Sequence, residues 1–227
     1  TPSGNIHGMP VACLCGHGPQ ALTTLSDAGG NAANPRIATN VAGFTAVDWT
    51  RDDGFNSIVQ AVVRSPDGSW SSPADLSDAG QDAGSPDVAV DGAGDAFAVW
   101  RRRDGRTSNW VVQSASRPAG NAWETSENLS DPAQDVDAPQ VATNLLGRAA
   151  AAWIVYDNQG QAARVQAAVR PSGGPWETSA VISPGWSDAV SPEVAVMVAL
   201  ANPLQVFRTA ALALFDQQRR SDRMVLT

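Results

Sequence analysis

The sequence predicts an all-β protein, a propeller-type array of four-stranded antiparallel blades in an incomplete ring of about three blades and part of a fourth. Two observations lead to this prediction. A unit of about 50 residues recurs along the chain, which is typical of repeat architectures. Each unit divides into short apolar segments separated by turns rich in Gly and Pro, which is typical of β-strands.

The repeat is defined by residues that return at fixed offsets. Its Leu-Ser pair recurs at spacings of 51, 53 and 53 residues, with Ile-Ser in the last unit. Agreement at this many offsets is far beyond chance and assigns six of the eight Trp to repeat positions. The repeated positions are Leu25-Ser26, Leu76-Ser77, Leu129-Ser130 and Ile182-Ser183; Pro35, Pro86, Pro139 and Pro192; Trp49, Trp100 and Trp153; Gln60, Gln113 and Gln166; Arg64, Arg117 and Arg170; Trp70, Trp123 and Trp176.

Each unit is expected to form four short strands. In the second unit these are predicted at 86–91, 96–102, 110–117 and 123–129. The first is expected to begin at Pro86, because proline has no N–H for the strand ladder and is confined to strand starts and edges. The units differ in length between the repeated Trp and the repeated Gln, which indicates a surface loop there.

The second strand of each unit is apolar on both faces. Segments 45–49, 96–100 and 149–153 are rich in Ala and Val and end in Trp, without polar alternation. A sheet with one wet face would alternate, so both faces should be covered. Radially stacked blades provide that cover. A helix is the alternative for the Ala-rich 149–152, but the two aligned segments disfavour it.

The repeat also predicts the organisation of the chain. The repeat fails after Val196, where Met197-Val198 stands in place of the expected Asp-Gly. A one-base frame shift would convert Asp-Gly into Met-Val. The tail is therefore a candidate frameshift product, and an amphipathic helix is the alternative. Open blade edges predict either a fragment of a larger propeller or self-association through those edges. The predicted parts are a non-repeat segment 1–24, blades 25–75, 76–128 and 129–181, the start of a fourth blade 182–196, and a divergent tail 197–227.

The composition excludes some partners. The net charge is −8 and the chain holds no Lys, so a nucleic-acid surface is not expected. No apolar run approaches the ~20 residues that span a bilayer, so no membrane partner is expected. Residues 1–24 also lack a basic start followed by an apolar core, so the chain shows no signal peptide.

No metal or other cofactor is expected. Cys13 and Cys15 form a C-x-C pair that is too small for a zinc site by itself. Together with His7 and His17 it could make a four-ligand metal set, but a disordered or foreign N-terminal segment is the favoured interpretation. The sequence Asp-Gly-Ala-Gly-Asp at 91–95 could suggest calcium. Because the aligned segments of the other units lack its acidic pair, it is interpreted as a turn.

The turns between the third and fourth strands resemble the Asp-box turn of sialidase-like (BNR/Asp-box type) bacterial β-propeller tandem repeats. Ser65, Asp67, Gly68 and Trp70 match the pattern in the first unit, and the corresponding turns of the other units match it loosely. The resemblance covers roughly residues 25–196 and implies an exported protein at an extracellular or cell-surface location. Asp boxes are structural turns, so the resemblance supports the fold more than a function.

Catalysis is not expected. Sialidase-like chemistry would need an arginine cluster, a Tyr nucleophile with a nearby Glu, and an acid/base Asp. Tyr156 is the only Tyr, and Glu124 and Glu177 share one repeat position beside a structural Trp. No catalytic residue is therefore assigned. A degenerate sialidase-like glycoside hydrolase fragment and a purely structural repeat of a larger exported protein remain as alternatives.

Recognition of a glycan or a protein partner is the favoured function, because propeller loops vary while the scaffold repeats. The most distinctive loop follows the run of three Arg at 101–103. The two Trp outside the repeat register are Trp110 and Trp186, and an exposed indole can stack on a sugar ring or a partner side chain. The candidate ligand-binding residues are Arg101, Arg103, Trp110 and Trp186.

Overall fold

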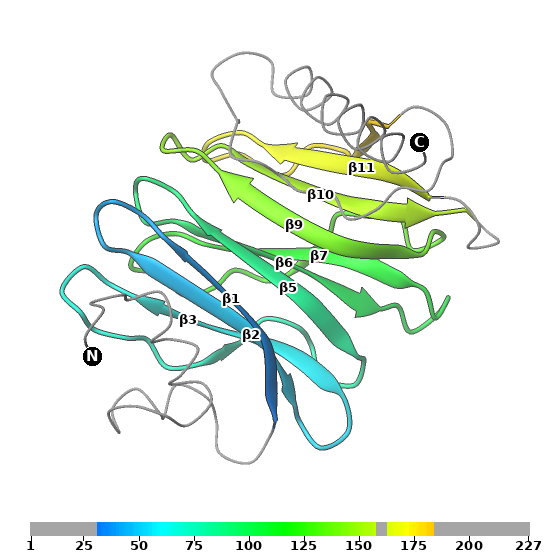
Figure 1. Ribbon diagram of the computed structural model, residues 1–227, viewed down its shortest axis with the longest axis horizontal. Helices are drawn as coiled ribbons and strands as arrows, with labels where there is room; N and C mark the ends of the chain where they lie inside the picture. The colour runs from blue at the N-terminus through cyan, green and yellow to red at the C-terminus, as the bar shows by residue number, and fades with distance from the viewer. Residues whose placement is uncertain (1–30, 158–162, 184–227) are drawn as a thin grey trace, which may run out of the picture.

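The computed structural model describes residues 31–157 and 163–183, which form three four-stranded antiparallel sheets (Figure 1). The all-β prediction is confirmed. Each sheet comes from one repeat, and its strands follow chain order across the sheet. The strands are β1 (Ala32–Thr39), β2 (Thr45–Asp52), β3 (Ser57–Arg64) and β4 (Ala74–Asp75); β5 (Ala83–Val90), β6 (Ala96–Arg103), β7 (Trp110–Arg117) and β8 (Glu127–Asn128); β9 (Val136–Thr143), β10 (Ala149–Tyr156), β11 (Ala163–Arg170) and β12 (Ala180–Val181).

The sheets stack on one another in the manner of propeller blades. The first strands β1, β5 and β9 lie side by side in Figure 1, and each of the later two also packs against the second strand of the preceding sheet. The predicted segments 1–24 and 197–227, and nearly all of 182–196, lie outside the described residues. Within 31–157 and 163–183, no helix reaches the length and apolarity needed to cross a bilayer.

The structure corrects the predicted start of the first strands. Strand β5 begins at Ala83 rather than at Pro86, and its register with β6 shifts between Gly84 and Asp87. Ser85, within this β-bulge, has a φ of 50°. A bulge accommodates a proline because it interrupts the ladder where the N–H is missing. Strands β1 and β9 carry the same shift, with Asn34 and Ala138 in the equivalent conformation.

Other strand boundaries follow the sequence more closely. The third strand of the second sheet runs over the predicted 110–117, and the second strand extends one residue beyond its predicted end. The fourth strand is shorter than predicted, since only Glu127–Asn128 pair with β7. Leu129 and Ser130 continue the contact, because the Leu129 N–H bonds the Val112 carbonyl at 2.8 Å and Ser130 Oγ accepts the Val112 N–H at 2.9 Å.

Both faces of the second strands are buried, as predicted. Trp49, Trp100 and Trp153 are fully buried, and the apolar clusters join residues of neighbouring sheets. One cluster combines Val99 of β6 with Trp153 of β10. Small Ala side chains on these strands allow the sheets to approach closely, while the indoles fill the wider spaces.

The repeated Trp and Gln form a polar link across the second and third sheets. Trp100 pairs with Gln113 across β6 and β7, and its indole N–H donates to Gln113 Oε1 at 3.2 Å. Gln113 Nε2 in turn donates to Asn128 Oδ1 on β8, at 2.9 Å. Trp153 donates to Gln166 at 2.9 Å in the third sheet. The link satisfies a buried indole N–H, which would otherwise be destabilising.

We expect Gln113→Met to reduce the free energy of unfolding by about 1–3 kcal/mol, because it leaves the buried Trp100 N–H without an acceptor. Urea denaturation of the purified chain measures this change. The control is Asn121→Ala in an exposed turn, which should change stability by less than about 0.5 kcal/mol. Equal stability of the wild type and Gln113→Met would contradict a structural role for the link.

Candidate functional site

The most distinctive site lies between the second and third sheets, at the end of the molecule where the β6–β7 and β8–β9 connections meet. Antiparallel strand order places these connections at one end and the Asp-box-like turns at the other. The site contains Arg101 and Arg103 from the end of β6, Trp110 from the start of β7, and Asp137 from the start of β9. We call these four residues the Arg–Trp cluster.

Both arginines of the cluster contact the indole. Alternate residues of a strand share a face, so Arg101 and Arg103 project to the same side of β6. Trp110 is the direct cross-strand partner of Arg103. The guanidinium carbons of Arg101 and Arg103 lie 4.4 Å and 4.5 Å from the centroid of the Trp110 ring, within cation–π distance.

Neighbouring groups fix the arginines in place. Arg101 Nη1 forms a 2.8 Å ion pair with Asp137 Oδ1 of the third sheet. Arg103 Nη1 donates to the Ser108 carbonyl within the β6–β7 loop. A planar guanidinium carries five N–H donors, so each arginine retains further donors after these contacts.

The β6–β7 loop is ordered by its own hydrogen bonds. Asp104 Oδ1 accepts the backbone N–H groups of Arg106 and Thr107 at 2.9 Å and 2.8 Å. These bonds favour the carboxylate and lower the pKa of Asp104. Asn109 Nδ2 donates to the Pro132 carbonyl at 3.0 Å, which ties the loop to the β8–β9 connection. The loop therefore presents a defined surface.

The cluster departs from the repeat, whereas the Asp135 contact follows it. Asp135 Oδ1 accepts the backbone N–H of Trp110 at 2.7 Å. In the same way, Asp82 Oδ1 accepts the backbone N–H of Ser57 at 3.0 Å between the first two sheets. No such counterpart exists for the four cluster residues in the described repeats. Arg101 aligns with Thr50 and Ile154, and Arg103 aligns with Asp52 and Tyr156. Trp110 aligns with Ser57 and Ala163, and Asp137 aligns with Ala33 and Gly84.

Tyr156 lies near the cluster at the end of β10. Desolvation raises the pKa of its phenol, the negative charges of Asp137 and Asp135 raise that pKa further, and Arg101 acts in the opposite direction. A raised pKa keeps the hydroxyl protonated. Tyr156 is thus suited to donate a hydrogen bond, and its surroundings oppose a role as a phenolate nucleophile.

The structure brings together three of the four candidate residues predicted from sequence: Arg101, Arg103 and Trp110. Trp110 is half-buried beneath two guanidinium groups, so its indole is not a free stacking platform. Trp186 lies outside the described residues. Asp137 was not predicted, although its departure from the Ala and Gly of the aligned positions was visible in the sequence.

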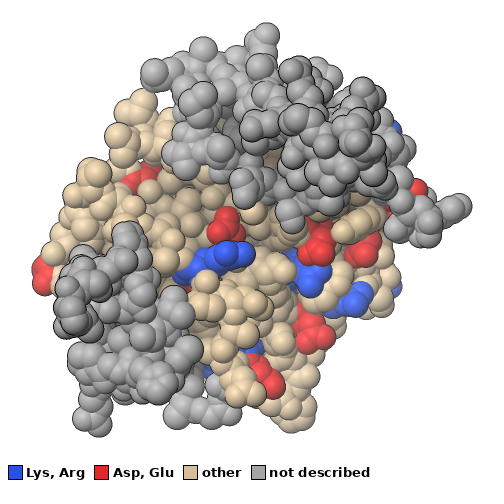
Figure 2. Space-filling view, viewed as in Figure 1, with Lys and Arg blue, Asp and Glu red and all other residues tan. Residues whose placement is uncertain are grey.

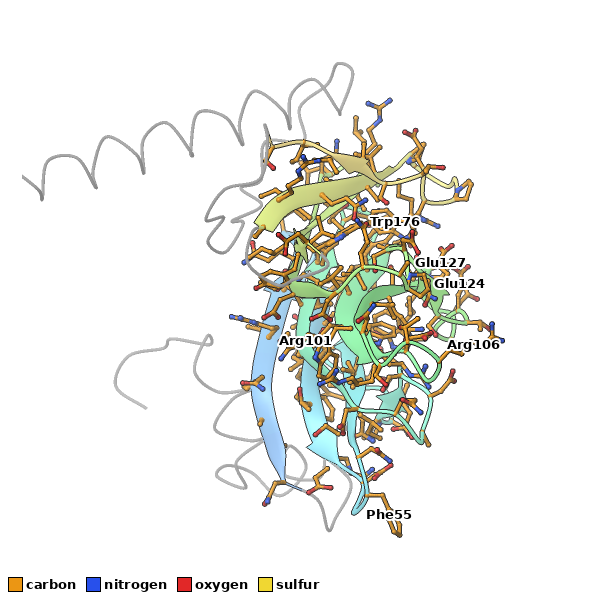
Figure 3. All side chains as sticks on the ribbon, turned by 90° about the vertical axis from the view of Figure 1, so that its right-hand side faces the viewer. Phe55, Arg101, Arg106, Glu124, Glu127 and Trp176 are labelled. Atoms are coloured by element: carbon orange, nitrogen blue, oxygen red, sulfur yellow. The ribbon has the colours of Figure 1, made fainter. Side chains whose placement is uncertain are left out.

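Charges are mixed on the face of the molecule that Figure 2 shows. Arg side chains lie there beside acidic ones rather than forming a continuous basic surface. In Figure 3, Glu124 and Glu127 lie on the opposite side of the sheets from Arg101, and both are exposed. These glutamates therefore do not join the cluster.

The Asp91–Asp95 segment forms a turn. Asp91 Oδ1 accepts the N–H groups of Ala93 and Asp95, both at 2.9 Å, and Asp95 Oδ1 accepts the Ala119 N–H at 2.8 Å. Asn144 Oδ1 makes the same two turn contacts in the third repeat, with Leu146 and Arg148. In the part of the chain that the structure describes, no three His, Cys, Asp or Glu residues gather as metal ligands.

Comparisons with known proteins assign no family. No family model matches the sequence. A segment of 25 residues is 68% identical to an arginase of Entamoeba histolytica, but it covers 11% of this chain and 8% of that protein. So short a match shows no family.

Among solved structures, the polysaccharide lyase Uly1 aligns with a TM-score of 0.48 and 10% identity, over 66% of this chain and 40% of that one. A protein of unknown function from Dyadobacter fermentans aligns with a TM-score of 0.30 and 10% identity, over 67% of this chain and 69% of that one. These scores are too low to support an argument about function.

A double-mutant cycle tests whether the cluster is a coupled unit. We expect Arg103→Met and Trp110→Leu to show a coupling free energy of about 0.5–1 kcal/mol in urea denaturation, because each substitution removes the same cation–π contact. The control cycle pairs Trp110→Leu with Arg106→Met. Arg106 is exposed in the same loop, so its coupling should be near zero. Strict additivity of the first pair would contradict the stacked arrangement.

Proposed function

We propose that this chain is a non-catalytic propeller-type recognition module that binds an acidic group of a glycan or protein partner at the Arg–Trp cluster. The observation that carries the proposal is the placement of two arginines on one indole, at positions where the neighbouring repeats hold other residues. Packing of the scaffold explains the repeated residues, but it does not require Arg101, Arg103 or Trp110 at their positions. Departures from a repeat at a loop end are where binding specificity is expected.

The chemistry of the cluster favours an anion. A guanidinium stacked on an aromatic ring keeps its N–H donors at its edge, where they match the oxygens of a carboxylate or a sulfate. The ion pair with Asp137 holds Arg101 in position, and the loop carbonyl of Ser108 holds Arg103. Fixed donors bind with a smaller loss of side-chain entropy than mobile ones.

A degenerate sialidase-like hydrolase is a less well supported alternative. The cluster and its neighbours Tyr156 and Asp135 bring arginines, a tyrosine and carboxylates into one region. Asp137 is ion-paired, however, and Asp135 accepts the backbone N–H of Trp110. The raised pKa of Tyr156 opposes nucleophilic attack. These contacts of Asp137 and Asp135 favour structural roles for both carboxylates.

The turn between β3 and β4 supports the resemblance to Asp-box repeats. Asp67 Oδ1 accepts the Ser69 N–H at 2.9 Å and the Ser69 hydroxyl at 2.7 Å, which lowers the pKa of Asp67. We extend the proposal on that basis to an exported protein acting outside the cell or at its surface. The turn lies at the end of the sheet away from the cluster, so its role is structural.

The proposal is tested by titrating the purified chain with uronic-acid and sulfated oligosaccharides, acidic peptides and neutral oligosaccharides. We expect one acidic class to bind and neutral sugars of equal length not to bind. Arg103→Met should weaken that binding by about tenfold or more, because it removes a fixed ionic donor. Raising the salt concentration should weaken it as well.

Arg106→Met serves as the matched control, since it removes the same charge from the exposed part of the loop and should leave affinity nearly unchanged. Equal affinity for acidic and neutral ligands, or equal loss in both variants, would contradict recognition by the cluster. Release of product from fluorogenic glycosides, abolished by Tyr156→Phe, would instead support the hydrolase alternative.

A further inference from the structure

An exposed aromatic side chain lies at the same end of the molecule as the Arg–Trp cluster. Phe55, in the β2–β3 loop, is 94% exposed and projects into solvent in Figure 3. Among the described residues, the other large apolar side chains that are exposed are aliphatic. The corresponding loops, 104–109 and 157–162, hold no aromatic residue in the sequence. Single exposed apolar side chains are common, so the meaning of Phe55 depends on how it is held and where it lies.

The β2–β3 loop holds Phe55 in a defined position. Asp53 Oδ1 accepts the backbone N–H groups of Phe55 and Asn56 at 2.8 Å and 2.7 Å. Asp52 Oδ1 accepts the backbone N–H of Gly54 at 2.8 Å. Gly54 has a φ of 97°, which glycine adopts without strain. The phenyl ring is therefore presented by an ordered loop, which reduces the loss of entropy when a ligand binds to it.

The β4–β5 connection lies between this loop and the loop of the Arg–Trp cluster. Asp82 Oδ1 accepts the backbone N–H of Ser57, which follows the β2–β3 loop, at 3.0 Å. The adjacent Gln81 reaches the β6–β7 loop, where its amide nitrogen lies 3.3 Å from the position that a Cβ on Gly105 would occupy. Phe55, Gln81 and the Arg–Trp cluster therefore follow one another across one end of two neighbouring sheets.

The three kinds of group in this row suit a chain of sugars. A phenyl ring offers a flat apolar face without a donor or acceptor, which matches the C–H face of a sugar ring. The primary amide of Gln81 has both donors and acceptors, which match sugar hydroxyl groups. The guanidinium groups of the cluster match an acid group. An acidic oligosaccharide repeats flat rings, hydroxyl groups and acid groups along its length, so it can engage all three.

We propose that Phe55 and Gln81 form a subsite beside the Arg–Trp cluster, and that the ligand of this end is an acidic oligosaccharide. The acid group of one sugar binds to Arg101 and Arg103, and a sugar further along the chain stacks on Phe55. Neighbouring stacked sheets lie about 10 Å apart, so an oligomer rather than a single sugar is needed to reach both loops. This inference rests on the proposed function and deepens it by naming the class of ligand.

The test measures the affinity of the full chain for oligogalacturonates and for heparin fragments of increasing length. We expect the affinity for one series to rise with length until the oligomer reaches from the cluster to Phe55. Phe55→Ala should weaken the binding of long oligomers by about three- to tenfold, the range of an aromatic contact, and leave the shortest ones unaffected. Phe55→Trp, which keeps an aromatic face, should retain the gain with length.

Val41→Ala is the matched control. Val41 is as exposed as Phe55 but lies in the β1–β2 turn at the opposite end of the sheets, so its loss should not change affinity at any length. Salt provides a second readout. Raising the salt concentration should reduce the contribution of Arg103 and preserve that of Phe55, because screening acts on charges and not on contact with a neutral ring.

Failure of this inference is distinguishable from failure of the proposed function. Oligosaccharide binding that depends on Arg103 but is equal in the wild type and Phe55→Ala would overturn the subsite and leave recognition by the cluster in place. Binding of acidic peptides without binding of either oligosaccharide series would overturn the ligand class alone. Absence of binding to every acidic ligand would overturn the subsite and the proposed function together.

Discussion

Burial of both faces of β2, β6 and β10 is the constraint on which the rest of the structure depends. Each of these strands contains a fully buried Trp, and a strand that is apolar on both faces needs cover on both sides. The indole N–H then needs an acceptor, which the repeated Gln provides in the second and third sheets. Packing and hydrogen bonding therefore account together for residues that recur in the sequence.

The sequence was sufficient for the sheets because their signals are local and repeated. Gln113 and Trp100 recur with their partners, and their spacing places them on adjacent strands. The bulge at Ser85 could not be predicted in this way, because Ser carries no particular signal for a left-handed backbone. Proline alone indicated an edge position, and the structure shows that a strand can begin before it.

The candidate site was only partly predictable for a different reason. Arg101, Arg103 and Trp110 are close in sequence, so their departure from the repeat identified them together. Asp137 joins them only through the packing of one sheet on the next, which no local pattern reveals. Phe55 was visible as an aromatic residue in a loop, but its place in a row with Gln81 and the cluster depends on the neighbouring sheet. The contacts that one repeat makes with the next therefore have to be read from the structure, because the repeat pattern does not predict them.

Stacking also determines how far a local disturbance can spread. Because each described sheet packs mainly on its sequence neighbour, the energetics approach those of a one-dimensional stack with nearest-neighbour terms. The Arg–Trp cluster draws residues from both partners of a single contact, so its ion pair exists only while the second and third sheets remain docked. Fraying at the first sheet would leave it intact. Separation of the third sheet would remove Asp137, the ion-pair partner of Arg101, before either sheet had lost its own hydrogen bonds.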